Sequence, residues 1–304
     1  MTTLPTEIGR QLPGASGETV PPRGAPSFLR AFMSNRLAVA GLIVLAFFVL
    51  AAILAPLVAP YDPQAQHLAQ RFAGPGRAHL LGQDELGRDV LSRIIHGARI
   101  SLTAGLAAVA FAGVLGALVG LTAGYLKGWA DSLLMRLMDV LLAFPSILLA
   151  TVIVTVLGQS LVNAMLAIGI VNIPQMARVV RSAVIAVRER EFVEAARAVG
   201  ASRRRILFTT ILPNTVAPLI VQATLTLATA ILDVAALSFL GLGAQAPTPE
   251  WGAMITDAFR SGFGVFITGQ HAILFPGLAI ALTVLAVNFI GDGLRDAFDP
   301  RRQG

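Results

Sequence analysis

The sequence predicts an all-α membrane protein with six transmembrane helices. Hydrophobic residues make up 55% of the 304 residues and charged residues only 13%, a composition far more apolar than that of a water-soluble domain. Several apolar stretches reach or approach the roughly 20 residues that a helix needs to cross a hydrocarbon core about 30 Å thick. Cysteine is absent, so we expect neither a disulfide framework nor thiolate chemistry.

The six predicted spans follow residue 36 in order. They cover residues 37–58, 100–125, 133–157, 161–180, 211–240 and 273–290. The fourth is the least regular because Asn163, Asn172 and Pro174 interrupt it, and a re-entrant segment is the alternative there. The fifth is longer than a bilayer requires and carries Pro213 and Pro218 near its start, which predicts a kinked or tilted helix that extends beyond the membrane.

The segments outside the spans complete the predicted organisation. Residues 1–36 are rich in Pro, Gly and Thr and predict a disordered tail without the apolar stretch of a signal peptide. Residues 59–98 form a long loop whose last part, from Val90 to Ala98, has apolar residues at helical spacing. This spacing predicts a short amphipathic helix on the membrane surface. Residues 99–293 hold the five further spans, and residues 294–304 form a second tail.

The distribution of basic residues predicts cytoplasmic N- and C-termini, because Lys and Arg concentrate in short cytoplasmic loops. With the N-terminus inside, the inner segments hold Arg30, Arg36, Lys127, Arg136, Arg178, Arg181, Arg188, Arg190, Arg197, Arg203, Arg204, Arg205, Arg295, Arg301 and Arg302. The 59–99 region is an exception with five arginines, but longer loops cross with less regard to charge. The net charge of +6 suggests anionic lipid or an acidic partner, and no nucleic-acid motif is visible.

Small residues recur at intervals of four in the second span. Gly116, Gly120 and Gly124 lie in register, and Gly105 and Gly113 precede them. This spacing lets a second helix approach backbone to backbone. We therefore expect the spans to form a packed bundle.

No catalytic or metal-binding constellation is visible. The only lysine, Lys127, is not part of a glycine-rich phosphate loop, and "GLGAQA" at 241–246 lacks the third glycine of a dinucleotide fingerprint. The four histidines, His67, His79, His96 and His271, lack ligand spacing. We therefore expect no catalytic residue, no metal site and no cofactor bound by this chain.

Asp233 is an acid inside the fifth span, where an ionised carboxylate at mid-depth costs on the order of 2.5–3.5 kcal/mol. Such a residue should face a bundle interior or an aqueous cavity. It is either an acid of a translocation path that attracts a cationic group, such as a peptide amine, or a carboxylate hydrogen-bonded to neighbouring helices. Asp139, one turn beyond Arg136, is expected to form a local ion pair with that arginine.

The stretch "EFVEAARAVGASRRRILFTTILPN", residues 191–214, is too charged to cross a bilayer. Its composition predicts two short helices on the cytoplasmic face, separated at Gly200, whose tolerance of positive φ suits a sharp break. Ser202 is placed to cap the second helix. Glu194, Ala195 and Ala196 lie just before the turn, where small side chains allow another surface to come close. This pattern is typical of a docking element, and a basic segment resting on anionic lipid is the alternative.

Several motifs resemble one family. "EAARAVG", with Leu212 and Pro213 following Gly200 by twelve and thirteen residues, resembles the EAA coupling loop of bacterial ABC import permeases, here at residues 189–213. Thr210 departs from the family, which usually has Ile there. "HLLGQDELGRDVLSRIIHGARISL", "MDVLLAFPSILLA", "ALSFLGLGAQAPTPEWGAMI" and "FPGLAIALTVLAVNFIGDGLRDAFDPR" resemble the C-type membrane subunit of dipeptide and oligopeptide importers.

The resemblance implies a type I ABC importer permease bundle with a cytoplasmic coupling loop, located in the bacterial cytoplasmic membrane. It implies a homologous second permease subunit, two ATP-binding subunits that carry ATP and magnesium, and an extracytoplasmic peptide-binding protein. It also implies import of dipeptides or short oligopeptides by alternating access.

Functional roles follow by position in these motifs. The residues implied to couple to the ATPase are Glu194, Ala195, Ala196, Gly200 and Ser202. Those implied to form an outer gate or to contact the binding protein are Asp84, Arg88, Asp89, Pro249 and Trp251.

A second class of function stays open at the level of sequence. A self-sufficient ion-coupled transporter or channel would use Asp233 to carry the ion, but we find no convincing internal repeat of the kind common in secondary transporters. An intramembrane enzyme is disfavoured because no catalytic constellation is visible.

Overall fold

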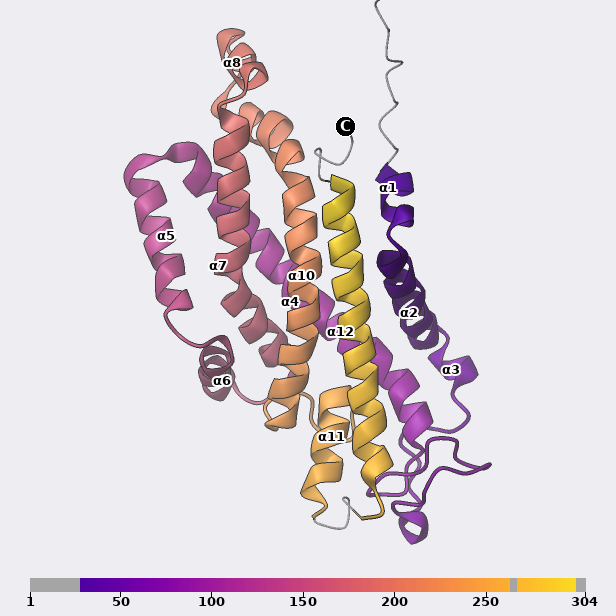
Figure 1. Cartoon of the computed structure of the whole chain (residues 1–304). Helices are drawn as coiled ribbons and strands as arrows, with labels where there is room; N and C mark the ends of the chain where they lie inside the picture. The colour runs from indigo at the N-terminus through magenta and orange to yellow at the C-terminus, as the bar shows by residue number, and fades with distance from the viewer. Residues whose placement is uncertain (1–27, 263–266, 299–304) are drawn as a thin grey trace, which may run out of the picture.

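The computed structural model describes residues 28–262 and 267–298, and over these residues the chain is helical, with an isolated β-bridge between Gln83 and Asp89. In chain order the elements are α1 (Phe28–Ser34), α2 (Arg36–Ile53), α3 (Ala55–Val58), the 3-10 helix η1 (Leu68–Gln70), α4 (Val90–Leu126), α5 (Gly128–Leu142), α6 (Ser146–Leu157), α7 (Leu161–Arg188), α8 (Glu191–Ala198), α9 (Arg203–Arg205), the π-helical η2 (Ile206–Ile211), α10 (Leu212–Phe239), α11 (Trp251–Arg260) and α12 (Gln270–Phe298). The long helices form a bundle in which α4 crosses behind α7, α10 and α12 (Figure 1).

The bundle has two distinct ends (Figure 1). One end carries α8, α1 and the last turns of α12, and we call it the α8 end. The opposite end carries α11 and the loop of residues 59–89 between α3 and α4, and we call it the α11 end. This arrangement places α1 and the C-terminal end of α12 at the same end of the bundle (Figure 1).

Five helices among the described residues are long and apolar enough to cross a membrane. These are α2, α4, α7, α12 and the continuous helix Arg203–Phe239 formed by α9, η2 and α10. The pair α5 and α6 passes the same test jointly but bends by 91° between them. The prediction of six spans is met if this bent pair counts as one.

The break between α5 and α6 corrects the prediction of a straight third span over 133–157. Pro145 has no backbone N–H, and its ring disfavours the α conformation in the preceding residue, Phe144, so the helix stops at Leu142. The fourth predicted span behaves in the opposite way. α7 is continuous through Pro174, and Asn172 donates from Nδ2 to the Ile168 carbonyl at 2.8 Å. The re-entrant alternative for residues 161–180 is therefore wrong, because they lie within one continuous helix.

The prediction of a separate amphipathic surface helix at residues 90–98 is wrong. These residues form the first turns of α4, which Asp89 caps by accepting from the Ser92 amide at 2.8 Å. Val90 and Ala98 pack in a core cluster with Trp251 and Phe48. The apolar face is therefore covered by protein and not by lipid.

The predicted tails are also partly helical. Phe32 of α1 is buried against Ala38 and Ala297, and Asn35 caps α2 while its Nδ2 donates to Asp296 Oδ2 at 3.2 Å. α12 continues to Phe298. Residues 1–27 and 299–304 of the predicted tails lie outside the described residues.

The glycine register of α4 packs against α7. A Cβ atom at Gly120 would lie 2.5 Å from the Ala177 carbonyl oxygen, and Gly116 and Gly124 also face α7 atoms within 3 Å. Gly105 faces Ile231 of α10 in the same way, whereas Gly113 has no atom within 4 Å of the position of its missing Cβ. Close approach of two helices is thus confirmed for the three glycines in register.

Candidate functional site

α8 projects from the α8 end of the bundle as a short helix (Figure 1), and Val193 is its one buried side chain. Val193 is fully buried and packs in a cluster with Val184 of α7 and with Ile206 and Ile211 of η2. The acidic residues in the first turn and Arg197 in the last turn suit the helix dipole. One buried side chain therefore connects α8 to the start of the long helix that ends at Phe239.

The turn after α8 depends on Gly200. Its φ of +77° lies in the left-handed region, which glycine adopts without steric cost. The Gly200 amide donates to the Arg197 carbonyl at 3.0 Å and the Ala201 amide donates to the Ala196 carbonyl at 3.1 Å. These two bonds form a Schellman motif. The break predicted at Gly200 is therefore present and has a defined geometry.

Beyond the turn, Ser202 is the N-cap of α9, accepting from the Arg205 amide at 3.4 Å. The helix that follows is not a second short helix, as predicted, but the beginning of the continuous helix Arg203–Phe239. The apolar residues of η2 and α10 extend the helical pattern through Pro213, which closely follows the π-helical turn of η2. A single short turn therefore joins α8 to the end of a helix long enough to cross a membrane.

The predicted coupling residues lie on the free surface of this segment. Glu194, Ala195 and Gly200 are exposed and Ala196 is half-buried. Within residues 28–262 and 267–298, the Glu194 carboxylate has no hydrogen bond or ion pair. α8 thus presents small residues together with the exposed Phe192 and two carboxylates, Glu191 and Glu194, that have no partner among the described residues.

A basic pocket of about 520 Å³ lies beside α8. Its charged lining residues are Lys127, Arg188, Glu189, Arg197 and Arg203. Arg188 is buried and donates from Nη1 to the Gly124 and Tyr125 carbonyls at 2.9 and 3.1 Å, at the end of α4. Lys127 pairs with Glu189 at 3.1 Å. The base of α8 is therefore tied to α4 as well as to α7.

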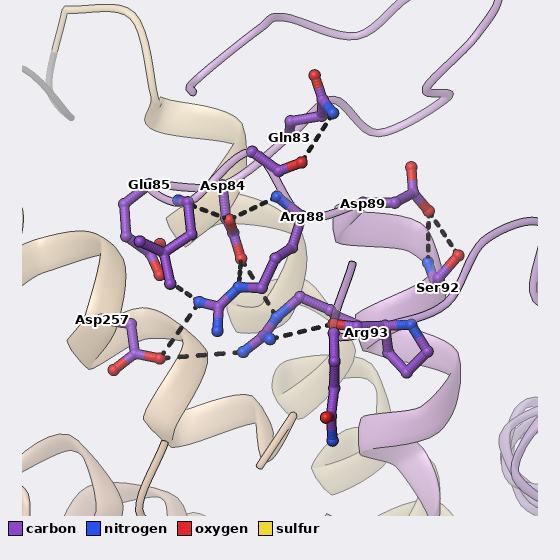
Figure 2. Close-up of polar contacts among 12 residues, drawn as sticks. Gln83, Asp84, Glu85, Arg88, Asp89, Ser92, Arg93 and Asp257 are labelled. Atoms are coloured by element: carbon purple, nitrogen blue, oxygen red, sulfur yellow. Dashed lines mark hydrogen bonds and ion pairs between the residues drawn. The ribbon is translucent and has the colours of Figure 1, made fainter. Parts of the chain in front are cut away.

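At the α11 end, a charged cluster of Asp84, Glu85, Arg88, Arg93 and Asp257 joins the 59–89 loop to α4 and α11 (Figure 2). Arg88 Nε donates to Asp84 Oδ2 at 2.7 Å, and its Nη2 pairs with Glu85 Oε1 and lies 3.5 Å from Asp257 Oδ2. Arg93 pairs with the same Asp84 oxygen at 3.3 Å. Four of these five side chains are buried, and their ion pairs link the loop to α4 and α11.

Burial changes the protonation of this cluster. Desolvation, reinforced by the neighbouring Asp84, raises the pKa of Glu85 to about 7 from its ordinary 4.5, although Arg88 opposes this shift. Glu85 therefore changes charge near neutral pH.

The other predicted outer residues are buried too. Asp89 pairs through Oδ1 with His79 at 2.9 Å, besides capping α4. Trp251 is fully buried and donates from Nε1 to the Ile94 carbonyl at 3.0 Å. Pro249 packs so closely that a Cβ at Gly97 would overlap its carbonyl. These residues fasten the 59–89 loop and α11 to α4, and they do not form an exposed contact surface.

Sequence reasoning missed several members of this end. Glu85 and Arg93 lie within the motif "DELGRDVLSR" but were not singled out. Asp257 joins them from a distant helix, and His271 contacts the Gln83 carbonyl at 2.8 Å from α12. A local motif cannot reveal contacts across such sequence distances.

Asp233 and Asp139 depart from the expected pairings. Asp139 pairs with Arg178 of α7 at 2.5 Å and not with Arg136, because α5 packs alongside α7.

Asp233 is half-buried in the last two turns of α10, nearer the α11 end than mid-depth. No residue in the described ranges forms a hydrogen bond or ion pair with its carboxylate. The hydrogen-bonded alternative is therefore not met within the described part of the chain.

Within the described part of the chain, no group of three or more His, Asp or Glu side chains is placed to hold a metal ion.

Comparison with known proteins decides the family. Residues 116–304, more than half of the chain, match the family described as binding-protein-dependent transport system inner membrane component. The chain belongs to this permease family. Residues 27–75 of the permease also match the N-terminal transmembrane domain of oligopeptide transport permease C, so both matches support the C-type subunit of a dipeptide or oligopeptide ABC permease.

Individual relatives agree with this assignment. The permease is 52% identical to the dipeptide transport system permease protein DppC of Alkalihalophilus pseudofirmus over 268 residues, 88% of this chain and 86% of the relative. It is 47% identical to the di/tripeptide transport system permease protein DppC of Pseudomonas aeruginosa, covering 95% of this chain and 96% of the relative. It is 44% identical to the glutathione transport system permease protein GsiD of Pectobacterium atrosepticum, with 90% of each chain covered.

A solved structure supports the fold. The inward-facing MetNI methionine ABC transporter aligns with 68% of the permease and 97% of that chain, with a TM-score of 0.53 and 20% identity. The type I ABC importer bundle implied by the resemblance is thus confirmed. Membership of this family also favours a subunit of a binding-protein-dependent importer over a self-sufficient ion-coupled transporter.

Proposed function

We propose that this permease imports dipeptides or short oligopeptides, with force supplied through α8 by separate ATPase subunits. The observation that carries the proposal is the exposed, small-residue surface of α8, anchored by the buried Val193 and terminated by the positive-φ turn at Gly200. The names of the relatives support the cargo class, since two of the three cited above transport di- or tripeptides and the third transports glutathione, itself a peptide.

The α8 end faces the cytoplasm in this proposal, so both termini are cytoplasmic. Most of the basic side chains gather at that end, as the positive-inside rule requires. The α11 end is also compatible with an extracytoplasmic position. Arg88 and Arg93 lie there, and both pair with the buried Asp84. Two of the five arginines that seemed to oppose this orientation therefore carry little net charge to the membrane surface.

The proposal requires partners. Two ATP-binding subunits carry ATP and magnesium and receive α8 in a cleft. A homologous second permease subunit completes the path across the membrane. An extracytoplasmic peptide-binding protein delivers cargo to the α11 end. Membership of a binding-protein-dependent transport family supports this set in general terms.

The geometry suggests how force passes from α8 to the bundle. Val193 transmits a displacement of α8 to Val184 of α7 and to Ile206 of η2. Arg188 transmits it to the carbonyl end of α4. Because α4, α7 and α10 pack on one another and interiors are close-packed, a shift at the α8 end repacks the bundle as a unit.

The role of the outer residues is refined by their burial. Asp84, Arg88, Asp89, Pro249 and Trp251 fix the loop in place, and contact with a binding protein falls to exposed residues of the same loop. Arg71 and Arg77 are exposed there and have no ion pair with any described residue. They suit an acidic patch on the delivering protein.

The experiment that tests the coupling role compares two variants of Gly200 in the reconstituted transporter. Gly200→Val forces a β-branched residue to a φ of +77°, at a cost of about 1–3 kcal/mol. We expect intact assembly and ATP hydrolysis but at least a tenfold loss of peptide imported per ATP. Gly200→Asn is the matched control because Asn tolerates the left-handed region, and it should retain most uptake. Normal coupling in Gly200→Val would contradict the docking role.

A further inference from the structure

A polar stripe runs along one face of α10. Gln222, Thr226, Thr229 and Asp233 follow one another at intervals of four, three and four residues, which places them within about 60° of one another around a helix of 3.6 residues per turn. Gln222 donates from Nε2 to Thr226 Oγ1 at 3.1 Å. With a rise of 1.5 Å per residue, the stripe is about 16 Å long, roughly half of the hydrocarbon thickness.

Most of the polar stripe lies away from the core of this chain. The core residues of α10 lie at other positions of the helix, including Ala230, Val234 and Leu237 in the cluster shared with α4 and α7. Thr226 is buried, but Thr229 is exposed and Gln222 and Asp233 are half-exposed. Three of the four stripe residues are therefore accessible at the surface of the described chain.

Lipid is a poor neighbour for this surface. A free carboxylate in a membrane-spanning helix is costly unless it meets water or a cation, and Asp233 has no partner among the described residues. The Gln222 amide nitrogen and the Thr229 hydroxyl donate within the helix, but Gln222 Oε1 accepts no hydrogen bond from the described residues and would be a further unpaired polar atom against hydrocarbon. The stripe must therefore face water or another protein chain.

The polar stripe extends along α10 from near the α11 end toward the α8 end. Asp233 lies six residues, about 9 Å, from the end of α10 at Phe239, near the α11 end. Gln222 lines a cavity of about 500 Å³ toward the α8 end, together with Val179, Pro218 and Arg295. A solute that passes along α10 would meet the acid first and the cavity afterwards.

We infer that the polar stripe lines the aqueous path for cargo, and that Asp233 binds a cationic ammonium group of the cargo near its extracytoplasmic mouth. The inference rests on the proposed function for the orientation and for the cargo class. A carboxylate that lacks a partner in its own chain is suited to an ammonium ion, and the hydroxyl and amide groups that follow exchange hydrogen bonds with a hydrated peptide backbone.

Water access along the stripe can be measured without transport. Because the chain contains no cysteine, single cysteines at Gln222 and Thr229 can be labelled in the assembled complex with a charged, membrane-impermeant thiol reagent. Leu232→Cys is the matched control, since Leu232 is exposed on the same helix but off the stripe. We expect the stripe cysteines to react at least tenfold faster than Cys at position 232. Equal reactivity at all three positions would overturn the aqueous path.

The role of the carboxylate is tested by transport kinetics. In the complete transporter, Asp233→Asn should lower the maximal rate of dipeptide import at least tenfold, while Asp233→Glu should restore most of it. The half-saturating dipeptide concentration should stay unchanged, because the binding protein sets it. Asp292→Asn, at an exposed acid of α12, is the control and should import normally.

The outcomes separate this inference from the proposed function. If the wild-type complex imports dipeptides and Asp233→Asn does so at the same maximal rate, the role of Asp233 is wrong and the proposed function stands. If the wild-type complex imports no peptide, the proposed function fails, and with it ammonium binding to a peptide cargo. The labelling rates then still decide whether α10 lines an aqueous path.

Discussion

At the scale of single residues, the α11 end is distinguished by ion pairs among buried charged side chains. Arg88 and Arg93 would be costly in a bilayer if left alone, yet three acids surround them. The motif "DELGRD" predicted that Asp84, Arg88 and Asp89 matter, but their burial could not be read from it. Asp257 completes the charged cluster from a helix far away in sequence, and nothing in its local pattern marks it.

Glu85 should give the permease a pH-dependent stability. Because its pKa is raised from 4.5 to about 7 in the folded chain, the folded state holds more protons than the unfolded state between these values. The stability that protonated Glu85 contributes is therefore complete below pH 4.5 and is lost as the pH rises to about 7. The change is on the order of 3 kcal/mol.

Unfolding of the detergent-solubilised permease across this pH range measures the effect. The free energy of unfolding should fall more steeply with rising pH in the wild type than in Glu85→Gln, whose amide does not titrate. Parallel curves for the two proteins would show that Glu85 does not titrate in this range.

At the scale of elements, sequence patterns predicted where helices exist better than where they bend or end. Long apolar runs predicted α2, α4, α7, α10 and α12 because burial and membrane crossing both require them. The bend after α5 was missed because apolar residues continue on both sides of Pro145. The helical register of residues 90–98 was recognised, but its burial under Trp251 depends on α11, which is distant in sequence and left no local signal.

The glycine register of α4 makes a prediction at this scale. Gly120→Val would drive side-chain atoms into the α7 backbone and should reduce the free energy of unfolding by about 1–3 kcal/mol. Gly113→Val, on the same helix with open space around it, changes helix propensity equally and serves as the control. The difference in unfolding free energy between the two variants therefore reports packing alone. Equal stability would contradict close α4–α7 contact.

At the scale of the whole molecule, the two ends of the bundle differ in the contacts that hold them. The α11 end is fastened by buried polar contacts that fix a loop and α11 to α4. The α8 end projects a small-residue helix on a single apolar anchor. The helix and turn of the proposed coupling segment could be predicted from sequence because its glycine, alanines and charges are local. The charge of Asp233 within an apolar run marked it as a candidate for a translocation path, but the rest of the proposed polar stripe could not be predicted, because it depends on which face of α10 the rest of the fold leaves uncovered.

The most direct measurement is uptake of a labelled dipeptide into liposomes that contain either this permease alone or the complete transporter with its ATPase subunits, second permease and binding protein. We expect uptake only by the complete transporter and only with hydrolysable ATP. Concentrative uptake by the permease alone, in liposomes without any ATPase subunit, would contradict the claim that this chain receives its driving force through α8.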